Sequence, residues 1–365
     1  MDDKCGITDP KPVQCDQIDP YGDLLLKVGL AIGKEHEFKV CSSAMRRASP
    51  VWKAMLYGPW KESKPVGDDW VVELPEEDPA LLRIILGMAH GRFDLVPRHV
   101  SLAQLYDILI PMDKYDLVHM IQPWAHGWVE AVRNPTPPAI KYPDRGDFGK
   151  DAELTGYGRI LRIHAAWELG CEDLVSADIA DFVFNFQISP SDSSAEVKVH
   201  YGSNNELLPP FENYFGPPDL IDVVMELRLS LIQTILDFYH GEISLRTNGG
   251  SGGCIHIHAA DRRLCDKLIL GGIWGHLESL NQEFLPKEAS EVVQSANQLI
   301  SSLSQMFAGL SVLNSNHNTC NPCSKYPEFV VGLRVDTRWV DVLRPHHLER
   351  MDGQRKKTGL CDTTT

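Results

Sequence analysis

Alternating apolar and polar residues near the N-terminus predict a small β-sheet. In residues 24–28, LLLKV, every second side chain is apolar, and turn residues lie on both sides of this run. Residues 38–40 repeat the alternation after the polar stretch GKEHE, so the two runs are expected to form a hairpin with the same face inward. Residues 72–74 have the same pattern and predict a third strand.

Helix start and stop signals surround these strands. They predict four helices: one through Arg47, one from Pro50 to Leu56, one from Asp78 and Pro79 to Gly91, and one from Ser101 onward. The last is expected to bend or end near Pro111, because proline lacks the backbone N–H and its ring clashes with the preceding turn. Strands and helices are interleaved, which predicts a small, helix-rich α+β unit.

The chain beyond residue 150 has helical periodicity almost throughout. Two long apolar stripes stand out: Leu220, Val224, Leu227, Leu231, Ile235 and Phe238, and then Val293, Ala296, Ile300, Leu303, Phe307 and Leu310. Stripes of this kind are typical of the core of a helical bundle. The predicted fold class is therefore α+β, with a mostly α-helical C-terminal domain.

The length of 365 residues exceeds the usual size of a single core, so two domains are expected. Proline-rich and polar stretches indicate the boundaries. The predicted organisation is a polar tail at 1–20, a first domain at 21–133, a proline-rich linker at 134–150, a helical domain at 151–345 with a flexible insertion at 189–219, and a polar tail at 346–365.

The charge balance excludes some partners. The sequence has 35 Lys and Arg against 50 Asp and Glu, a formal net charge of −15. Phosphate backbones and anionic membranes would repel such a chain, so neither nucleic acid nor a membrane is an expected partner. The short basic patch at 355–357 is too small to change this expectation.

The compartment is predicted from the N-terminal residues and the cysteines. The polar, acidic start MDDKCGITDPKPVQCD has no apolar core, so it is not expected to act as a signal or transit sequence. No run of about 20 apolar residues occurs, so no membrane span is expected. Nine cysteines at irregular spacing fit reduced thiols better than a disulfide framework. A cytoplasmic or nuclear protein is the resulting expectation.

The first domain carries residue types at a specific spacing. They are Asp23 before the first strand, then Phe38, Ser49, Pro50, Val51, Trp52, Met55 and Leu56, and a later segment with Asp113, Lys114, Tyr115, Asp116, Trp124 and Trp128. With these residues the stretch resembles a BTB/POZ domain. Most of the chain is similar to the fungal BTB/POZ proteins often labelled nuclear-pore-like. The resemblance implies a non-enzymatic function in protein binding, through self-association or partner docking.

The resemblance also implies a role for Asp23. In BTB domains the aspartate that opens the strand and a basic residue after a later strand line the homodimer interface. Here Asp23 is present, but Cys41 and Ser42 stand where the basic pair is common. Since a buried carboxylate without a partner is costly, Asp23 is expected to find another donor or to lie near solvent, with Arg46 or Arg47 as candidate cations.

A second candidate contact is Trp60 with Glu62. Cullin-binding BTB domains carry an apolar residue, any residue and an acid at the corresponding place, which implies a substrate adaptor of a cullin-type ubiquitin ligase as an alternative function. A bulky apolar anchor beside a carboxylate suits such a contact. The alternative reading is that Trp60 covers the domain's own core and Glu62 is solvated.

Cysteine and histidine in the C-terminal half could form a metal site. The candidate ligands are Cys254, Cys265, Cys320, Cys323 and His317, with His256 and His258 nearby in the sequence. A C-x₂-C pair with further thiolates or imidazoles can complete a tetrahedral zinc site, and a zinc-stabilised regulator is a further alternative. Buried cysteines and surface histidines without a metal would explain the same residues.

Enzyme motifs are almost absent. The run GGSGG at 249–253 matches G-x-S-x-G literally, but a nucleophile elbow needs a buried strand before the serine and a helix after it. A flexible glycine loop around Ser251 is the expected structure. P-loop, H-E-x-x-H and dinucleotide fingerprints do not occur, so the chain is not expected to be an enzyme.

Overall fold

The computed structural model gives an α+β protein in which helices predominate. It describes residues 14–67, 69–135, 155–189, 198–202, 205–208, 216–247, 253–255, 257–279, 284–312, 315–336 and 342–360. The chain divides into two compact units. Unit 1 consists of residues 1–150, 164–171 and 349–365, and unit 2 consists of residues 151–163 and 172–348.

Unit 1 contains a four-stranded sheet. Its strands, in spatial order, are β1 (Cys15–Gln17), β3 (His36–Val40), β2 (Leu24–Val28) and β4 (Val71–Leu74). The predicted hairpin is confirmed, since β2 and β3 are antiparallel with Leu26 opposite Phe38. The predicted third strand, β4, lies parallel to β2. β1 falls within the stretch predicted to be a tail and pairs in parallel with β3.

Unit 1 contains the helices α1 (Ser42–Ala48), α2 (Pro50–Tyr57), α3 (Pro79–Ala89), α4 (Leu102–Lys114) and α5 (Gln122–Arg133), with short 3₁₀ turns η1 (Leu30–Ile32), η2 (Phe93–Leu95) and η3 (Val118–Ile121). Helices α2, α3 and α4 begin where their sequence signals predict, whereas α1 begins at Ser42 after Cys41, without a side-chain cap. Ser49, Asp78 and Ser101 cap α2, α3 and α4 through their side chains. Helix α4 continues through Pro111 and ends at Lys114, which agrees with the predicted end near the proline.

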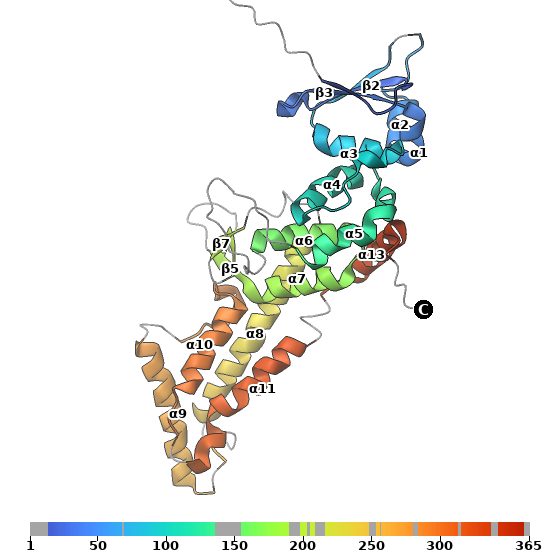
Figure 1. The fold of residues 1–365 in the computed structure, drawn as a ribbon. Coiled ribbons are helices and arrows are strands. Elements are labelled where there is room, and N and C mark those ends of the chain that lie inside the picture. The colour runs from blue at the N-terminus through green and yellow to red at the C-terminus, as the bar shows by residue number, and fades with distance from the viewer. Residues whose placement is uncertain are drawn as a thin grey trace, which may run out of the picture. The chain divides into compact units, whose positions relative to one another are not determined.

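The core of unit 1 lies between the sheet and these helices. Figure 1 shows α1 to α3 on one side of the strands. Leu26 and Phe38 are fully buried, as the alternation of the strands requires, and Trp52 of α2 is fully buried as well. The Ser49 hydroxyl accepts the Trp52 backbone N–H at 2.9 Å and donates to the Tyr115 carbonyl at 2.6 Å. One buried serine therefore fixes the start of α2 and its contact with the end of α4.

The D-K-Y-D segment at the end of α4 makes contacts within unit 1. Asp113 pairs with Arg350, and Asp116 pairs with Lys357. Glu77 accepts bonds from both the Lys114 ammonium and the Tyr115 hydroxyl. Burial, together with the neighbouring Glu77 carboxylate, raises the pKa of Tyr115. The tyrosine therefore stays a neutral donor to Glu77. The charges of the segment therefore meet partners from the same chain.

The predicted polar tail at 346–365 differs from the structure. Residues Pro345–Thr358 form helix α13, and Met351, Gln354 and Thr358 are buried. In unit 1, Arg350 and Gln354 donate to the buried carboxylate of Glu168, which belongs to helix α6 (Gly156–Leu169). The helix was not predicted because only one narrow stripe of α13 is buried, and the remaining side chains are mostly charged.

Unit 2 is built mainly from long helices. They are α7 (Glu172–Asn185), α8 (Leu220–Thr247), α9 (Ala259–Ser279), α10 (Ala296–Ala308) and α11 (Pro322–Val335), with 3₁₀ turns η5 (Ala289–Glu291) and η6 (Ser315–Cys320). A three-stranded sheet consists of β5 (Phe186–Ser189), β6 (Lys198–Tyr201) and β7 (Glu206–Leu207). α10 contacts both α8 and α11, and the three run alongside one another in yellow, orange and red in Figure 1.

The long helix α8 buries a face slightly rotated from the predicted stripe. Leu231 and Ile235 are buried as expected, but Leu227 is only half-buried and Arg228 is fully buried beside it. The Arg228 guanidinium donates to the backbone carbonyls of Phe186 at 3.2 Å, Val292 at 2.9 Å and Gln294 at 2.8 Å. This arginine therefore joins α8 to β5 and to the segment before α10.

Candidate interaction surface and metal centre

The turn that carries Trp60 is fixed by hydrogen bonds on several sides. The Ser63 hydroxyl accepts the Trp60 backbone N–H at 3.2 Å and donates to the carbonyl of Gly58. The backbone N–H of Lys64 returns to the Leu56 carbonyl at 3.2 Å. Because these bonds tie the turn to the end of α2, its backbone has one defined path. Residues 58–64 are called the Trp60 turn below.

Trp60 itself projects from this turn into solvent, with 61% of its surface exposed. The alternative that Trp60 covers the domain's own core is therefore wrong. The tryptophan that packs into the core is Trp70, which is buried. Its indole N–H donates to the Glu62 carbonyl at 2.9 Å. The Glu62 side chain lies 3.6 Å from the Lys61 ammonium and is partly exposed. Partner binding by Trp60 and Glu62 stays a prediction.

Asp23 has its partners within the chain. One carboxylate oxygen accepts the Ser42 backbone N–H at 2.8 Å, and the other accepts the Ser42 hydroxyl at 2.9 Å and the Lys64 ammonium at 3.0 Å. Partial burial raises the pKa of Asp23, but the Ser42 bonds and Lys64 outweigh it, so the net pKa is lowered. The cation is therefore Lys64. Arg46, which was a candidate, instead lies 4.8 Å over the Tyr57 ring.

This arrangement predicts a pH-dependent contribution of Asp23 to stability. A carboxylate with a lowered folded-state pKa stabilises the fold above its unfolded pKa of about 4, and loses that effect as pH falls through the folded value. Because Asp23 is more than a third exposed, solvent screening limits the effect to about 0.5–1 kcal/mol. We expect Asp23→Asn to lower the free energy of unfolding at pH 7 by this amount and at pH 3 by much less, as measured by urea denaturation.

Lys64→Met supplies the control for this prediction. It should lower stability at pH 7, and the double variant Asp23→Asn, Lys64→Met should lose less than the sum of the two single changes, because both remove the same ion pair. Equal losses from Asp23→Asn at pH 7 and pH 3 would contradict the prediction.

Four of the five predicted metal ligands come together in unit 2. Cys254 precedes α9, Cys265 lies in its second turn, and His317 and Cys320 lie on η6. All four are buried, and one donor atom from each lies within 4.8 Å of the others. The Cys254 Sγ is 3.2 Å from the His317 Nδ1 and 3.5 Å from the Cys320 Sγ. The cluster of Cys254, Cys265, His317 and Cys320 is called the Cys/His cluster below.

Cys323, the fifth predicted ligand, is not part of the cluster. The Asn321 side chain caps α11 by accepting the Cys323 backbone N–H at 2.9 Å, so α11 begins between the two cysteines of the C-x₂-C pair. The helix turns Cys323 away into a half-buried position. Of the two nearby histidines, His258 is exposed and His256 lies outside the described residues. The sequence spacing thus identified the C-x₂-C pair, but it did not show that a helix begins between the two cysteines.

Charged side chains from α8 support the Cys/His cluster. Arg246 donates to the Cys320 carbonyl at 2.7 Å and to the Glu242 carboxylate at 2.7 Å. Burial raises the pKa of Asp266, next to Cys265, although Arg246 and the Cys254 backbone N–H oppose the shift. A Cβ on Gly253 would stand 2.6 Å from the Asp266 carboxylate, so a larger residue here would require that side chain to move. No sequence signal pointed to Arg246.

A second group of metal-binding residue types lies around Asp219 in unit 2. His346 and His347 approach the Asp219 carboxylate, His347 at 2.9 Å. Arg344 also lies 2.7 Å from that carboxylate. A guanidinium already provides the positive charge here, so the group is an ion-pair network and a poor metal site.

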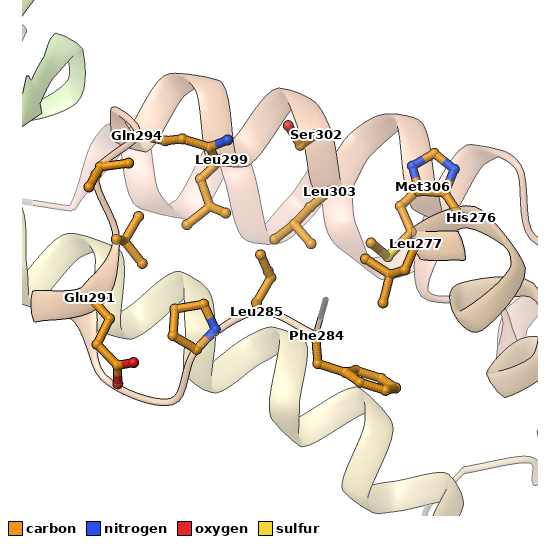
Figure 2. A pocket seen from close by; sticks show the side chains of 13 residues that line it. His276, Leu277, Phe284, Leu285, Glu291, Gln294, Leu299, Ser302, Leu303 and Met306 are labelled. Atoms are coloured by element: carbon orange, nitrogen blue, oxygen red, sulfur yellow. The ribbon is translucent and has the colours of Figure 1, made fainter. Parts of the chain in front are cut away.

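An apolar groove lies in unit 2 between the end of α9 and α10. Figure 2 shows Leu299, Leu303 and Met306 of α10 facing Leu285 of the segment that follows α9. Leu277, near the end of α9, completes the lining at one end. Most of the lining side chains are apolar, and the polar ones are His276, Glu291, Gln294 and Ser302. Ser251 of the glycine loop lies outside the described residues.

The comparisons with known proteins give no relative. No protein-family model matches the chain, and neither a curated protein nor a solved structure matches it. Among the described residues, no helix has the length and apolar character needed to cross a membrane.

Proposed function

We propose that this chain is a non-enzymatic protein-interaction protein whose BTB-like unit 1 docks a protein partner through the Trp60 turn. The observation that carries the proposal is the exposed Trp60 on a turn held by its own hydrogen bonds. An aromatic side chain on a fixed backbone loses little conformational freedom on binding, which favours it as an anchor. The order of strands and helices in residues 24–133 supports the BTB resemblance.

Docking of a different protein is favoured over a BTB homodimer. Asp23 is satisfied by Ser42 and Lys64 of its own chain, so it does not require a cation from a second copy. The Trp60 turn, by contrast, pairs an exposed indole with the Glu62 carboxylate, whose only ion pair among the described residues is with Lys61 at 3.6 Å. The matching surface is an apolar groove with a basic donor beside it. A cullin is the partner that the resemblance implies, which makes a ubiquitin-ligase adaptor the specific form of this proposal.

Replacing Trp60 and Glu62 together by alanine in the full chain tests this proposal. Anchors of this kind contribute roughly 2 kcal/mol or more, so cullin binding should weaken at least about 30-fold. Since Trp60 is exposed, the melting temperature should stay within about 2 °C of wild type. The measurement is cullin co-purification beside thermal melting.

Phe93→Ala is the matched control, because Phe93 is exposed to the same extent, 62%, elsewhere on unit 1. Its loss should leave cullin recovery unchanged. A wild-type chain that recovers no cullin removes the adaptor hypothesis. Sedimentation of the full chain at micromolar concentration tests the homodimer: a dimer that Trp60→Ala dissociates would assign the Trp60 turn to a second copy of this chain.

We also propose that the Cys/His cluster holds zinc. Zinc bonds of about 2.3 Å to sulfur and about 2.0 Å to nitrogen place tetrahedral donor atoms roughly 3.5–3.8 Å apart. The Cys254 sulfur lies 3.5 Å from the Cys320 sulfur and 3.2 Å from the His317 nitrogen, each about 0.3 Å below these values. Three thiolates and one imidazole are ligands that zinc favours. Such a site requires reduced thiols, in agreement with a cytoplasmic or nuclear location.

A further inference from the structure

Helix α9 is embedded in unit 2 along only a narrow face. Although it spans 21 residues, its buried residues are Cys265, Ile269, Ile273 and Leu277. They follow one another at intervals of four, which gives a stripe only one side chain wide, whereas a helix packed on a core usually buries three or four residues in every two turns. Trp274, also on α9, remains 57% exposed. Apolar packing alone therefore holds this helix weakly.

The first residue of that stripe, Cys265, is also a member of the Cys/His cluster. Its partners come from outside the helix: Cys254 from the connection before it, and His317 and Cys320 from η6. η6 is in turn joined to α8, since Arg246 donates to the Cys320 carbonyl at 2.7 Å. A metal ion in the cluster would therefore link the start of α9 to η6 and, through Arg246, to α8.

The donor set indicates a structural ion. Four protein donors complete a tetrahedral shell, so no position is left for water or substrate, and closed sites of this kind are structural. All four side chains are buried. Because the ligands belong to segments more than 50 residues apart, the free energy of metal binding stabilises their tertiary arrangement.

The groove of Figure 2 depends on the position of this helix. His276 and Leu277, at the end of α9, line the groove together with Leu299, Leu303 and Met306 of α10. Without the anchor at Cys265, the burial of Ile269, Ile273 and Leu277 alone would hold the helix, and weakly held elements open first. The shape of the groove is thus tied to the cluster at the other end of α9.

We infer that zinc in the Cys/His cluster anchors α9 to the remainder of unit 2 and thereby maintains the apolar groove between α9 and α10. This inference rests on the proposal that the cluster holds zinc, and it is independent of the docking function of the Trp60 turn. Loss of zinc is expected to release α9 and open the groove, while unit 1 keeps its structure.

The test uses the full chain purified under reducing conditions, with metal content measured by mass spectrometry. We expect one zinc per chain. Hydrogen exchange is then compared before and after removal of the metal with a chelator, and again after zinc is restored. Removal should speed exchange in residues 259–279 and 315–320 by at least tenfold, leave residues 24–57 of unit 1 unchanged, and be reversed by added zinc.

Matched variants separate the ligands from other cysteines. Cys265→Ser should abolish stoichiometric zinc and speed exchange in α9. Cys323→Ser, which lies outside the cluster, should retain both. If the Cys265 variant does not fold, the chelation experiment on the wild-type chain still decides the question.

The outcomes distinguish the two proposals. A chain that binds no zinc contradicts the zinc proposal itself. A chain that binds one zinc but keeps α9 equally protected after its removal overturns the α9 inference and leaves the zinc proposal standing. Faster exchange throughout unit 2, with no difference between α9 and α10, would equally overturn the specific role for α9.

Discussion

A chain that ends at Leu348 is expected to lose at least about 5 kcal/mol of the free energy of unfolding of unit 1. The truncation removes Arg350 and Gln354, the two side chains that bond the buried carboxylate of Glu168. A buried charge left without its partners costs about 3–5 kcal/mol. Removing the buried Met351 side chain adds about 2 kcal/mol. Since whole domains are stable by only about 5–15 kcal/mol, unit 1 should be marginal or unfolded.

Guanidinium denaturation followed by tryptophan fluorescence measures this loss, because unit 1 contains Trp52, Trp70 and Trp128 in buried positions. The single change Arg350→Met should reproduce a large part of it, by about 3 kcal/mol. Lys356→Ala, an exposed position on the same helix, should have an effect below about 0.5 kcal/mol. If the truncated chain unfolds at the wild-type midpoint, the assignment of 349–358 to unit 1 is wrong.

Arg228→Met is expected to destabilise unit 2 by about 3–5 kcal/mol. The substitution keeps a side chain of similar length but removes every donor to the carbonyls of Phe186, Val292 and Gln294. Each buried carbonyl that loses its bond costs about 1–3 kcal/mol, and partial rearrangement offsets some of the sum. Burial lowers the pKa of Arg228 to about 10, so the guanidinium is still charged at neutral pH and its bonds are charge-assisted.

Urea denaturation of the full chain measures the effect, with Ser230→Ala on the exposed side of α8 as the matched control. Arg228→Lys should give an intermediate loss, because a single ammonium cannot reach three carbonyls that a planar guanidinium spans. A loss below about 1 kcal/mol for Arg228→Met would show that water replaces the guanidinium at these carbonyls.

Local signals account for what could be predicted of the fold. Ser49, Asp78 and Ser101 act on the turn directly after them, so their capping roles depend only on neighbouring residues. The alternation in β2 and β3 likewise fixes which side chains face the core. Helix α13 was missed because its buried stripe includes Gln354 and Thr358, whose burial depends on contacts with Glu168 and Leu169, more than 180 residues away.

The sequence predicted many of the residues of the candidate sites, but it did not predict which of them lie together in space. Lys64 completes the environment of Asp23 from 41 residues away, and no spacing rule relates the two. The C-x₂-C pair suggested Cys320 and Cys323 together, but the start of α11 separates them. The sequence left open whether Trp60 is exposed or covers the core, and in the structure Trp70 is the buried tryptophan. Tertiary contacts decided each case.

The composition of unit 1 from three separate stretches has a consequence for synthesis of the chain. Residues 164–171 leave the ribosome well before residues 349–358, which supply Arg350 and Gln354. At about 5–20 residues per second, the interval is roughly 10–40 seconds. During that time Glu168 has neither partner and the nascent N-terminal unit is incomplete. Its completion must wait for the translation of nearly all of unit 2, so the first unit in the sequence is the last to be finished.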